Sequence, residues 1–255
     1  MDCPSYAKNK ELEMFTVPDG VTRIPSNTFD QCGRLREVIL PDSLEEICDM
    51  AFSGCMALER ISIPAGVTSI GPQAFTYCMG LKEIEVSEDN AEYSSYKGAL
   101  YDRYRSVLVK YPAGLTGEAE LPEDLFEIGA WAFEWSAVSS IKIPDGVTKI
   151  GSRAFSGCVR AAEISIPETV TRIGDQAFFG CQSLRELVIP DGVMIIERSA
   201  FYNCRNLEKI YIPDSVASLD SWVFDGCQKL TVYCPEGSYT WEYCEAVGIP
   251  HEDYV

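Results

Sequence analysis

Histidine is nearly absent from this sequence, whose single copy, His251, lies near the C-terminal end. Ser-His-Asp and Cys-His catalytic arrangements both need a histidine beside the nucleophile, so the rest of the chain holds neither. The sequence also lacks a C-x-x-C pair, which argues against a zinc site, and it lacks G-x-G-x-x-G and G-x-x-x-x-G-K-[ST] phosphate loops. We therefore expect no enzyme activity, no cofactor and no metal.

Basic residues and long apolar runs are also scarce. Lys and Arg number 21 against 39 Asp and Glu, which gives a net charge of −18. A surface of that charge repels nucleic-acid phosphates and anionic lipid heads, so nucleic acid is not an expected partner. No apolar run approaches the ~18 residues of a membrane-spanning helix, so no membrane insertion is expected. The acidity is typical of a solvated surface, and the alternative is that it attracts a basic partner.

Internal repetition is what the sequence has in abundance. Most of the chain reads L-x-x-I-x-I-P-x-x-V-x-x-I-x-x-x-A-F-x-x-C, and eight such units are present. The part before the proline alternates apolar and polar residues, which predicts a strand with one buried side. V-x-x-I predicts a second short strand, and A-F-x-x-C suits one tight helical turn. The prolines recur every 23 residues in two runs, apart from one spacing of 22: Pro18, Pro41, Pro64, Pro122, Pro144, Pro167, Pro190 and Pro213.

Stacking of the units explains why they repeat. A single coil cannot bury its own apolar side, whereas stacked coils cover one another and form a continuous core. Equivalent side chains then line up along the stack at the strand spacing of ~4.8 Å. We expect an aromatic ladder of Phe29, Phe52, Phe75, Phe133, Phe155, Phe178, Phe201 and Phe224. We expect an aliphatic ladder of Ile24, Ile47, Ile70, Ile128, Ile150, Ile173, Ile196 and Leu219.

Seven of the eleven cysteines share one repeat position. A buried thiol behaves as a small apolar group, and side chains on neighbouring coils point in parallel rather than toward each other. These seven are therefore predicted to be structural thiols outside any disulfide: Cys32, Cys55, Cys78, Cys158, Cys181, Cys204 and Cys227. Cys3, Cys48, Cys234 and Cys244 lie elsewhere, and a disulfide between Cys234 and Cys244 stays open as a hypothesis.

One segment, residues 87–121, interrupts the period. It predicts a β-hairpin with strands at 98–101 and 107–111 and a turn at 102–106, which joins the stack. The functional alternative is a protruding recognition loop, because tyrosines, which are favoured at interfaces, gather there: Tyr93, Tyr96, Tyr101, Tyr104 and Tyr111. The next coil is one residue short and has Trp135-Ser136 in place of Gly-Cys, so Trp135 is a candidate to fill the gap.

The two ends of the stack differ. Ser238 is predicted to begin a short capping helix that runs to about Val247, and Gly248 to end it. Residues 1–11 show no clear cap, so this end is expected to pair with more chain, a partner or another copy of the chain. The predicted organisation is one domain over 1–255: an N-terminal flank (1–11), three repeats (12–86), the hairpin insertion (87–121), five repeats (122–234) and a C-terminal cap (235–255).

The unit I-P-D-G-V-T-x-I-G-x-x-A-F-x-G-C, intact at 143–158, resembles the BspA-like leucine-rich repeats of bacterial surface and secreted proteins. The resemblance covers about residues 12–250, including N-x-x-Y at 90–93, Y-P-A-G at 111–114 and G-I-P at 248–250. It implies an α/β fold class: a right-handed leucine-rich-repeat solenoid, β-rich with short helical turns, of about eight 23-residue coils interrupted by a β-hairpin insertion. It also implies the absence of catalytic residues.

The resemblance further implies adhesion or protein recognition at a cell surface. We expect a non-catalytic module that binds a partner protein, such as a host or cell-surface protein. Charged residues break up residues 1–17 and leave no apolar stretch of the kind that export requires, so a cytoplasmic location is the alternative to a secreted or surface one. The alternative function is a structural or Ca²⁺-stabilised spacer, which the acidic run Ser87-Glu88-Asp89-Asn90 suggests, although no EF-hand-type loop is present.

Binding is expected on the open face of the sheet. If the isoleucines and leucines of each strand point inward, the residues between them form this face. A face that is merely solvated is the other interpretation. The candidate contact residues are Glu37, Arg60, Glu83, Glu85, Lys142, Glu186 and Tyr211, with Tyr101 and Tyr104 from the insertion.

Overall fold

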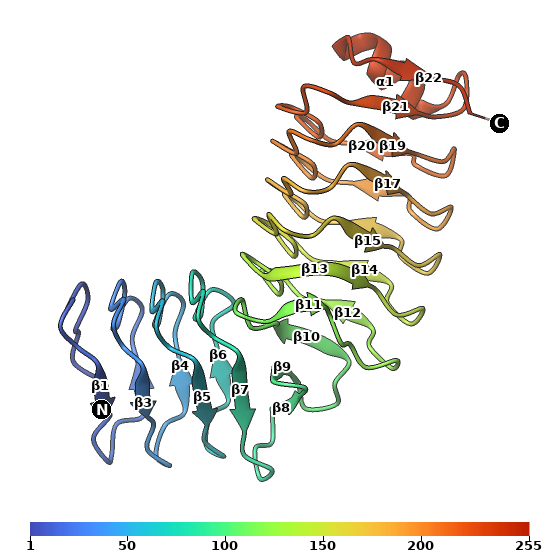
Figure 1. Ribbon diagram of the computed structural model, residues 1–255. Helices are drawn as coiled ribbons and strands as arrows, with labels where there is room; N and C mark the ends of the chain where they lie inside the picture. Colours follow the sequence, from blue (N-terminus) through green and yellow to red (C-terminus); the bar gives the residue numbers. More distant parts are fainter. Residues whose placement is uncertain (255) are drawn as a thin grey trace. The chain divides into compact units, whose positions relative to one another are not determined.

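The computed structural model describes residues 1–254 as a solenoid of stacked coils (Figure 1), so the predicted fold class is confirmed. The coils fall into two compact units. The N-terminal unit comprises residues 1–115 and 131–136, and the C-terminal unit comprises residues 116–130 and 137–254. The assignment of one domain to the whole chain stays a prediction, and its last residue, 255, lies outside the described residues.

In the N-terminal unit, each coil supplies two short strands that pair in parallel with the strands one coil away. Glu46, for example, lies opposite Ser69. The first strands of the coils are β1 (Met14–Thr16), β3 (Glu37–Ile39), β5 (Arg60–Ile63) and β7 (Glu83–Val86). The second strands are β2 (Arg23–Ile24), β4 (Glu46–Ile47) and β6 (Ser69–Ile70). The antiparallel strands β8 (Tyr93–Tyr96), β9 (Ala99–Asp102) and β10 (Val107–Lys110) follow.

The C-terminal unit repeats the same plan. Its first strands are β11 (Thr116–Glu118), β13 (Ala137–Lys142), β15 (Glu163–Ser165), β17 (Glu186–Val188), β19 (Lys209–Tyr211) and β21 (Thr231–Tyr233). Its second strands are β12 (Glu127–Ile128), β14 (Lys149–Ile150), β16 (Arg172–Ile173), β18 (Ile195–Ile196) and β20 (Ser218–Leu219). The helix α1 (Tyr239–Val247) and the strand β22 (His251–Glu252) complete it.

Both predicted ladders are present within each unit. All eight phenylalanines are buried. The ring centroids of Phe52 and Phe75 are 5.6 Å apart, and those of Phe178 and Phe201 are 5.1 Å apart. The aliphatic rungs are direct strand partners, as Ile47 is of Ile70. The apolar core therefore runs along each stack and leaves the strand surfaces to the solvent.

Tight turns join the second strand of one coil to the first strand of the next. In one of them the Cys55 N–H donates to the Phe52 carbonyl at 3.2 Å. The residue before the cysteine has a positive φ, which glycine adopts at least cost: 71° at Gly54 and 72° at Gly157. This backbone requirement explains the recurrent Gly-Cys pair. Other residues adopt the same conformation where glycine is missing: Gln31, Tyr77, Trp135 and Asn203.

All eleven cysteines lie among the described residues and carry reduced thiols, so the bridge between Cys234 and Cys244 is not formed. The ladder thiols have a specific partner, the backbone carbonyl of the aromatic residue one coil earlier. Cys204 Sγ donates to the Phe178 carbonyl at 3.0 Å. The same contact joins Cys32 to Tyr6, Cys55 to Phe29, Cys78 to Phe52, Cys181 to Phe155 and Cys227 to Phe201. A small apolar side chain with a weak donor fits this position.

Residues 1–11 form a partial coil beside the second strand of the first coil and the turn that follows it. The expectation of an end without a cap is therefore wrong for that part of the first coil. Tyr6 takes the phenylalanine position, with its ring 5.7 Å from that of Phe29. The N–H groups of Tyr6 and Lys8 donate to the carbonyls of Thr28 and Asp30. Tyr6 stands 23 residues before Phe29, so the period carried this signal, and the substitution of Tyr for Phe concealed it.

The predicted hairpin is confirmed, because β9 and β10 pair antiparallel. The sequence analysis missed β8, which pairs with the other edge of β9. After the hairpin, Tyr111 takes the aromatic position, with its ring 4.6 Å from that of Phe133. Tyr6 and Tyr111 thus hold rungs that a count of phenylalanines overlooks, and the solenoid has about ten turns rather than the eight expected.

The short coil is accommodated by β13 rather than by the tryptophan. β13 begins at Ala137 and has six residues, whereas β15 has three. Because extended residues span more distance than residues in a turn, the early start of this strand compensates for the missing residue. The Trp135 ring instead packs against that of Tyr77, with centroids 5.1 Å apart.

The predicted C-terminal cap is confirmed over its described residues. Ser238 Oγ accepts a hydrogen bond from the Trp241 N–H at 3.2 Å, and Gly248, with a φ of 77°, ends α1. The ring of Tyr243 packs edge-on against Phe224 at 6.5 Å, and β22 pairs with β21. Helix and strand together cover the last rungs of the C-terminal unit.

Candidate recognition surface

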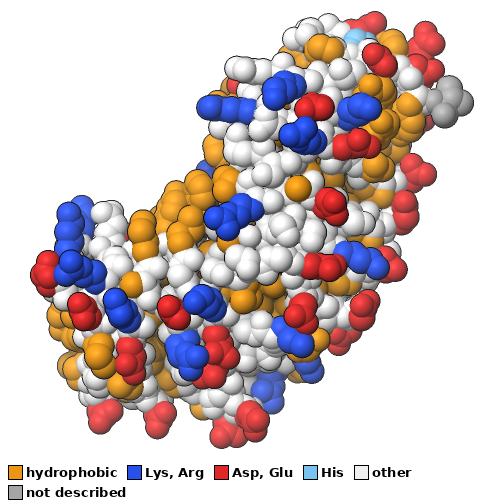
Figure 2. Space-filling model, viewed as in Figure 1, with side chains coloured by type: hydrophobic (Ala, Val, Ile, Leu, Met, Phe, Trp, Pro, Cys, Tyr) orange, Lys and Arg blue, Asp and Glu red, His pale blue; other side chains and the backbone are white. Residues whose placement is uncertain are grey.

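The first strands of the coils present alternate residues to the solvent, as predicted. In β3, Glu37 and Ile39 are exposed and Val38 is buried. In β17, Glu186 and Val188 are exposed in the same way. The two-residue period of a strand produces this alternation. Figure 2 shows acidic, basic and apolar side chains close together over the visible face of the N-terminal unit, so the surface is mixed rather than uniformly acidic.

Many charged side chains pair with an opposite charge one coil away. Arg23 Nε lies 2.7 Å from Glu46 Oε2, and Lys149 Nζ lies 2.7 Å from Glu127 Oε1. Such exposed pairs contribute at most about 1 kcal/mol each to stability. For recognition, the informative charges are those that these coil-to-coil pairs leave out, because they are available to a partner.

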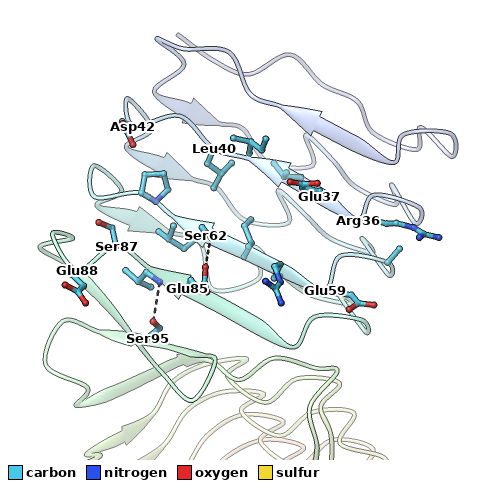
Figure 3. Close-up of a pocket in the computed structure, with 18 residues that line it drawn as sticks. Arg36, Glu37, Leu40, Asp42, Glu59, Ser62, Glu85, Ser87, Glu88 and Ser95 are labelled. Atoms are coloured by element: carbon cyan, nitrogen blue, oxygen red, sulfur yellow. Dashed lines mark hydrogen bonds between the residues drawn. The ribbon is translucent and has the colours of Figure 1, made fainter.

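A groove of about 1210 Å³ lies across β3, β5 and β7 and is here called the N-terminal groove (Figure 3). Three predicted candidates line it: Glu37, Arg60 and Glu85. A fourth, Glu83, contributes indirectly, since its Oε2 lies 3.7 Å from Arg60 Nη2. Ile39, which is 50% exposed, adds an aliphatic side chain to the lining.

The charges of the N-terminal groove do not balance. Arg60 is paired with Glu83, and Glu59 is paired with Lys82 at 3.3 Å, so Arg36 is the one lining cation that makes no ion pair with a described residue. Four lining carboxylates likewise make no ion pair within residues 1–254: Glu37, Asp42, Glu85 and Glu88. The groove therefore offers a surplus of negative charge next to aliphatic side chains.

A second groove, of about 750 Å³, lies across β13, β15 and β17 and is here called the C-terminal groove. The predicted candidates Lys142 and Glu186 line it. Its exposed aliphatic side chain is Val188, at 57% exposure. Both grooves use a similar strand, Arg36-Glu37-Val38-Ile39 in the first and Arg185-Glu186-Leu187-Val188 in the second. Each unit thus presents a comparable surface.

Tyr211 belongs to a separate aromatic cluster in the C-terminal unit. Its ring stacks on that of Tyr233 with centroids 4.9 Å apart, and Tyr254 packs edge-on against it at 5.7 Å. Tyr211 is half-buried in this cluster. It remains accessible for contact, although it does not line either groove.

The two tyrosine candidates of the insertion have opposite outcomes. Tyr101 is fully buried, because β9 lies between β8 and β10 and its ring packs against Tyr96 at 6.4 Å. The prediction that Tyr101 contacts a partner is therefore wrong. Tyr104, on the turn between β9 and β10, is 83% exposed.

The buried cysteine thiols and His251 are held within the packing of the solenoid. Burial raises the pKa of the Cys78 and Cys244 thiols to about 12, so the nucleophilic thiolate is scarce at neutral pH. The His251 ring packs edge-on against Trp241 at 4.5 Å. Within residues 1–254, no three His, Cys, Asp or Glu side chains gather closely enough to hold a metal ion. No helix of the described chain is long and apolar enough to cross a membrane.

Most lining residues of the N-terminal groove were not among the predicted contact residues, and Asp42, Glu88 and Ser95 are three of them. Asp42 and Glu88 lie two or three residues after the ends of β3 and β7. A residue just beyond a surface strand borders the strand face, so their position was a usable signal. Ser95 carried none, because β8 itself was not expected. Its Oγ accepts a hydrogen bond from the Val86 N–H at 3.3 Å.

Comparison with known proteins places most of the chain in one family. Residues 4–101 and 114–231 match the BspA type leucine rich repeat region, with six copies. No curated protein matches the chain. A solved structure of a leucine rich cell surface protein from Faecalibacterium prausnitzii is 34% identical, with a TM-score of 0.82, and the match covers 92% of this chain and 62% of that one. The chain therefore spans less than two thirds of that relative.

Two more distant structures show the same fold. The pneumococcal vaccine antigen PcpA is 20% identical, with a TM-score of 0.73, over 96% of this chain and 68% of its own. A leucine-rich repeat protein from Eubacterium ventriosum is 23% identical, with a TM-score of 0.64, over 91% of this chain and 77% of its own. At these identities the likeness extends to the fold alone.

Proposed function

Because the chain belongs to the BspA-type leucine-rich repeat family, we propose that it is a non-catalytic module that recognises a protein partner through its strand faces. One observation carries this proposal: each unit has an open groove in which carboxylates that make no ion pair with a described residue stand beside an exposed aliphatic side chain. Extended surfaces of stacked repeats are well suited to binding other proteins. The grooves combine charged and aliphatic side chains, as protein interfaces do.

The contact residues follow from the two grooves. Glu37, Arg60 and Glu85 act in the N-terminal groove, and Lys142 and Glu186 act in the C-terminal groove. Glu83 orients Arg60 through their ion pair. Two exposed or half-exposed tyrosines extend the surface, Tyr211 on β19 and Tyr104 on the insertion. Tyrosine is favoured at interfaces because it combines a large ring with a polar hydroxyl.

The location that we propose is the outside of a cell, where the module adheres to a host or cell-surface protein. The support is the 34% identical relative, which is described as a leucine rich cell surface protein. Surface labelling of intact cells, compared with labelling after lysis, tests this location directly. Protection of the protein in intact cells would favour the cytoplasmic alternative.

The Ca²⁺-stabilised spacer is a weaker candidate, because Asn90 is already fully engaged. Its Nδ2 donates to the carbonyls of Pro64 at 2.8 Å and Val67 at 2.9 Å, and its Oδ1 accepts from the N–H groups of Glu92 and Tyr93. Both lone pairs of that oxygen are used. The acidic run therefore lacks the amide oxygen that would have joined its carboxylates around calcium.

Self-association through the N-terminal end is a further part of the proposal. Among the described residues β1 pairs with β3 alone, so the backbone of its outer edge is left for another strand. The backbone of residues 1–11 bonds to the second strand of that coil and the turn after it, and Tyr6 contacts β1 through its ring, 4.4 Å from that of Phe15. Sedimentation velocity over a range of concentrations tests this: a growing dimer fraction supports it, and a monomer throughout contradicts it.

The test of recognition uses one charge reversal in each groove. The double variant Glu37→Lys/Glu186→Lys is compared with Glu45→Lys/Glu242→Lys, which makes the same charge change at exposed residues outside both grooves, again one in each unit. The immobilised chain is exposed to solubilised surface proteins, and captured proteins are identified and titrated. We expect roughly tenfold weaker binding in the groove variant and unchanged binding in the control. Equal binding by both variants would contradict the proposal.

A further inference from the structure

We infer that the N-terminal groove takes an extended protein segment that turns aliphatic and lysine or arginine side chains toward it. This inference rests on the proposed function and gives the chemistry of the partner at one of its two surfaces. The groove crosses three neighbouring strands, and its lining runs from the beginnings of these strands to the residues that follow them (Figure 3). A segment of several residues therefore fits it better than a single compact ligand.

The aliphatic part of the groove calls for an aliphatic partner. Ile39 on β3 is 50% exposed, and Leu40 and Val86 are partly exposed. Ile61 and Ile63 of β5 lie between them and are buried. An apolar side chain laid against Ile39 removes apolar surface from water on both molecules, which favours association.

The charged part of the groove is polarised along the strands. Figure 3 shows Asp42, Ser87 and Glu88 at one end, Arg36 and Glu59 at the other, and Glu85 between them. Asp42, Glu85 and Glu88 make no ion pair within the described residues. Glu85 Oε2 accepts a hydrogen bond from Ser62 Oγ at 3.0 Å, which holds this carboxylate in place on the strand face. A cationic side chain is the complement of that end of the groove.

Other partner classes fit the groove less well. The surplus of carboxylates repels the phosphates of nucleic acids and anionic lipids. Its lining contains no aromatic side chain among the described residues, whereas sugars and unpaired bases are commonly held by stacking on aromatic rings. A protein segment supplies both aliphatic and cationic side chains.

The C-terminal groove differs from the N-terminal groove in one row of exposed strand residues. Ile39, Ser62 and Glu85 stand at equivalent positions on successive strands of the N-terminal groove. The same row in the C-terminal groove reads Lys142, Ser165 and Val188. The C-terminal lining also holds four carboxylates that make no ion pair within the described residues: Glu118, Glu163, Glu168 and Glu186. The two grooves therefore differ in where charge stands along this row, and the C-terminal groove provides an internal comparison.

The probe is a fluorescein-labelled peptide, Val-Ser-Lys-Ser-Val-Ser-Lys. Every second residue of an extended peptide faces one side, so its valines and lysines face the groove together. Two matched peptides replace either both lysines by glutamate or both valines by serine. Binding to the intact chain is measured by fluorescence anisotropy at low salt, since exposed charges are screened at high salt. We expect the parent peptide to bind at least about tenfold more tightly than either matched peptide.

The variants localise the binding. We expect Glu85→Lys and Ile39→Asp each to weaken binding of the parent peptide roughly tenfold, and the milder Glu85→Gln to weaken it about threefold. Glu45→Lys, outside the groove, and Glu163→Lys, in the C-terminal groove, leave it unchanged. Far-ultraviolet circular dichroism verifies that each variant is folded, which is expected because these side chains are exposed.

Several results would overturn the inference: equal binding of all three peptides, tighter binding of the glutamate peptide, or equal weakening by Glu85→Lys and Glu45→Lys. The two proposals fail separately. Capture of a surface protein that depends on Glu37 and Glu186, together with no binding of the lysine peptide, would leave the proposed function standing and remove only the cationic segment. If neither the protein capture nor the peptide binding is observed, the proposed function and the cationic segment are both overturned.

Discussion

Phe178 illustrates how much one rung of the aromatic ladder contributes. Its ring is fully buried and stacks on Phe155 and Phe201, with centroids 5.1 Å away in both directions. Truncation of a buried phenylalanine removes its transfer free energy and leaves a cavity, at a cost of about 3–5 kcal/mol. We expect Phe178→Ala to lower the free energy of unfolding by that amount, measured by urea denaturation followed by circular dichroism.

The neighbouring Phe179 is the matched control for this substitution. It carries the same side chain one residue later but is half-buried, and its ring stacks on that of Tyr202 at 5.4 Å. Phe179→Ala should cost about 1 kcal/mol, because less apolar area is lost and water fills the space. Equal losses at Phe178 and Phe179 would show that the ladder has no special energetic role.

At the residue scale, the repeat period predicted which side chains form the buried ladders, but the exposure of side chains outside the repeat was predicted less well. The positions of the phenylalanine, isoleucine and cysteine ladders follow from a 23-residue repeat, because stacked coils place like beside like. Tyr101 lies outside the repeat, and its burial depends on β8, which covers it from a neighbouring strand. Composition alone suggested an interface there, whereas the sheet uses that tyrosine as core.

Among the elements, the insertion is fastened to the preceding coil by Asn90. This side chain is fully buried and donates to the carbonyls of Pro64 and Val67. Replacing it with alanine leaves both carbonyls without these donors inside the protein. We expect Asn90→Ala to lower the free energy of unfolding by about 2–3 kcal/mol in urea denaturation.

Asn206 is the control for Asn90. Its Nδ2 also donates to a carbonyl one coil earlier, that of Gln182 at 2.9 Å, but the side chain is only partly buried. Water can replace that bond, so Asn206→Ala should cost less than about 1 kcal/mol. Millimolar calcium should not restore the stability of Asn90→Ala, and a calcium-dependent recovery would revive the metal-stabilised spacer.

The elements that the sequence predicted are those with local signals. The capping helix was found because Ser238 and Gly248 mark its two ends through capping and a positive φ. β8 was missed because Tyr-Ser-Ser-Tyr has no clear alternation of apolar and polar residues, although the two-residue turn Lys97-Gly98 joins it directly to β9. The grooves were not predicted as cavities, since their shape depends on three strands lying side by side.

Across the whole molecule, buried thiols should make the free energy of unfolding fall as the pH becomes alkaline. Burial raises the pKa of Cys3 to about 11 and those of Cys78 and Cys244 to about 12, from an ordinary value of 9.0. The folded state thus favours the neutral thiol. Its stabilising contribution is complete below pH 9 and is lost as the pH rises toward the folded-state values. We expect the free energy of unfolding to fall above pH 9 by up to about 1.4 kcal/mol per pH unit for each such thiol.

The measurement is a series of urea denaturation curves between pH 7.5 and 11. The double variant Cys78→Ala/Cys244→Ala removes one thiol with a raised pKa from each unit. It should be less stable at neutral pH but show a shallower decline above pH 9, because two of the groups responsible are gone. A decline of the same slope in both proteins would assign the effect to other groups.

Each coil meets its neighbours through strand partners at a fixed interval, as Glu46 meets Ser69 and Arg172 meets Ile195. The strand pairing of a coil therefore does not depend on the total number of coils. Duplication or loss of a gene segment that encodes one full period leaves the surviving registers intact, whereas the loss of a single residue must be absorbed locally, as the long β13 does in its short coil. Such a protein can change its reach and the area it offers to a partner in discrete steps, without redesign of the coils it keeps.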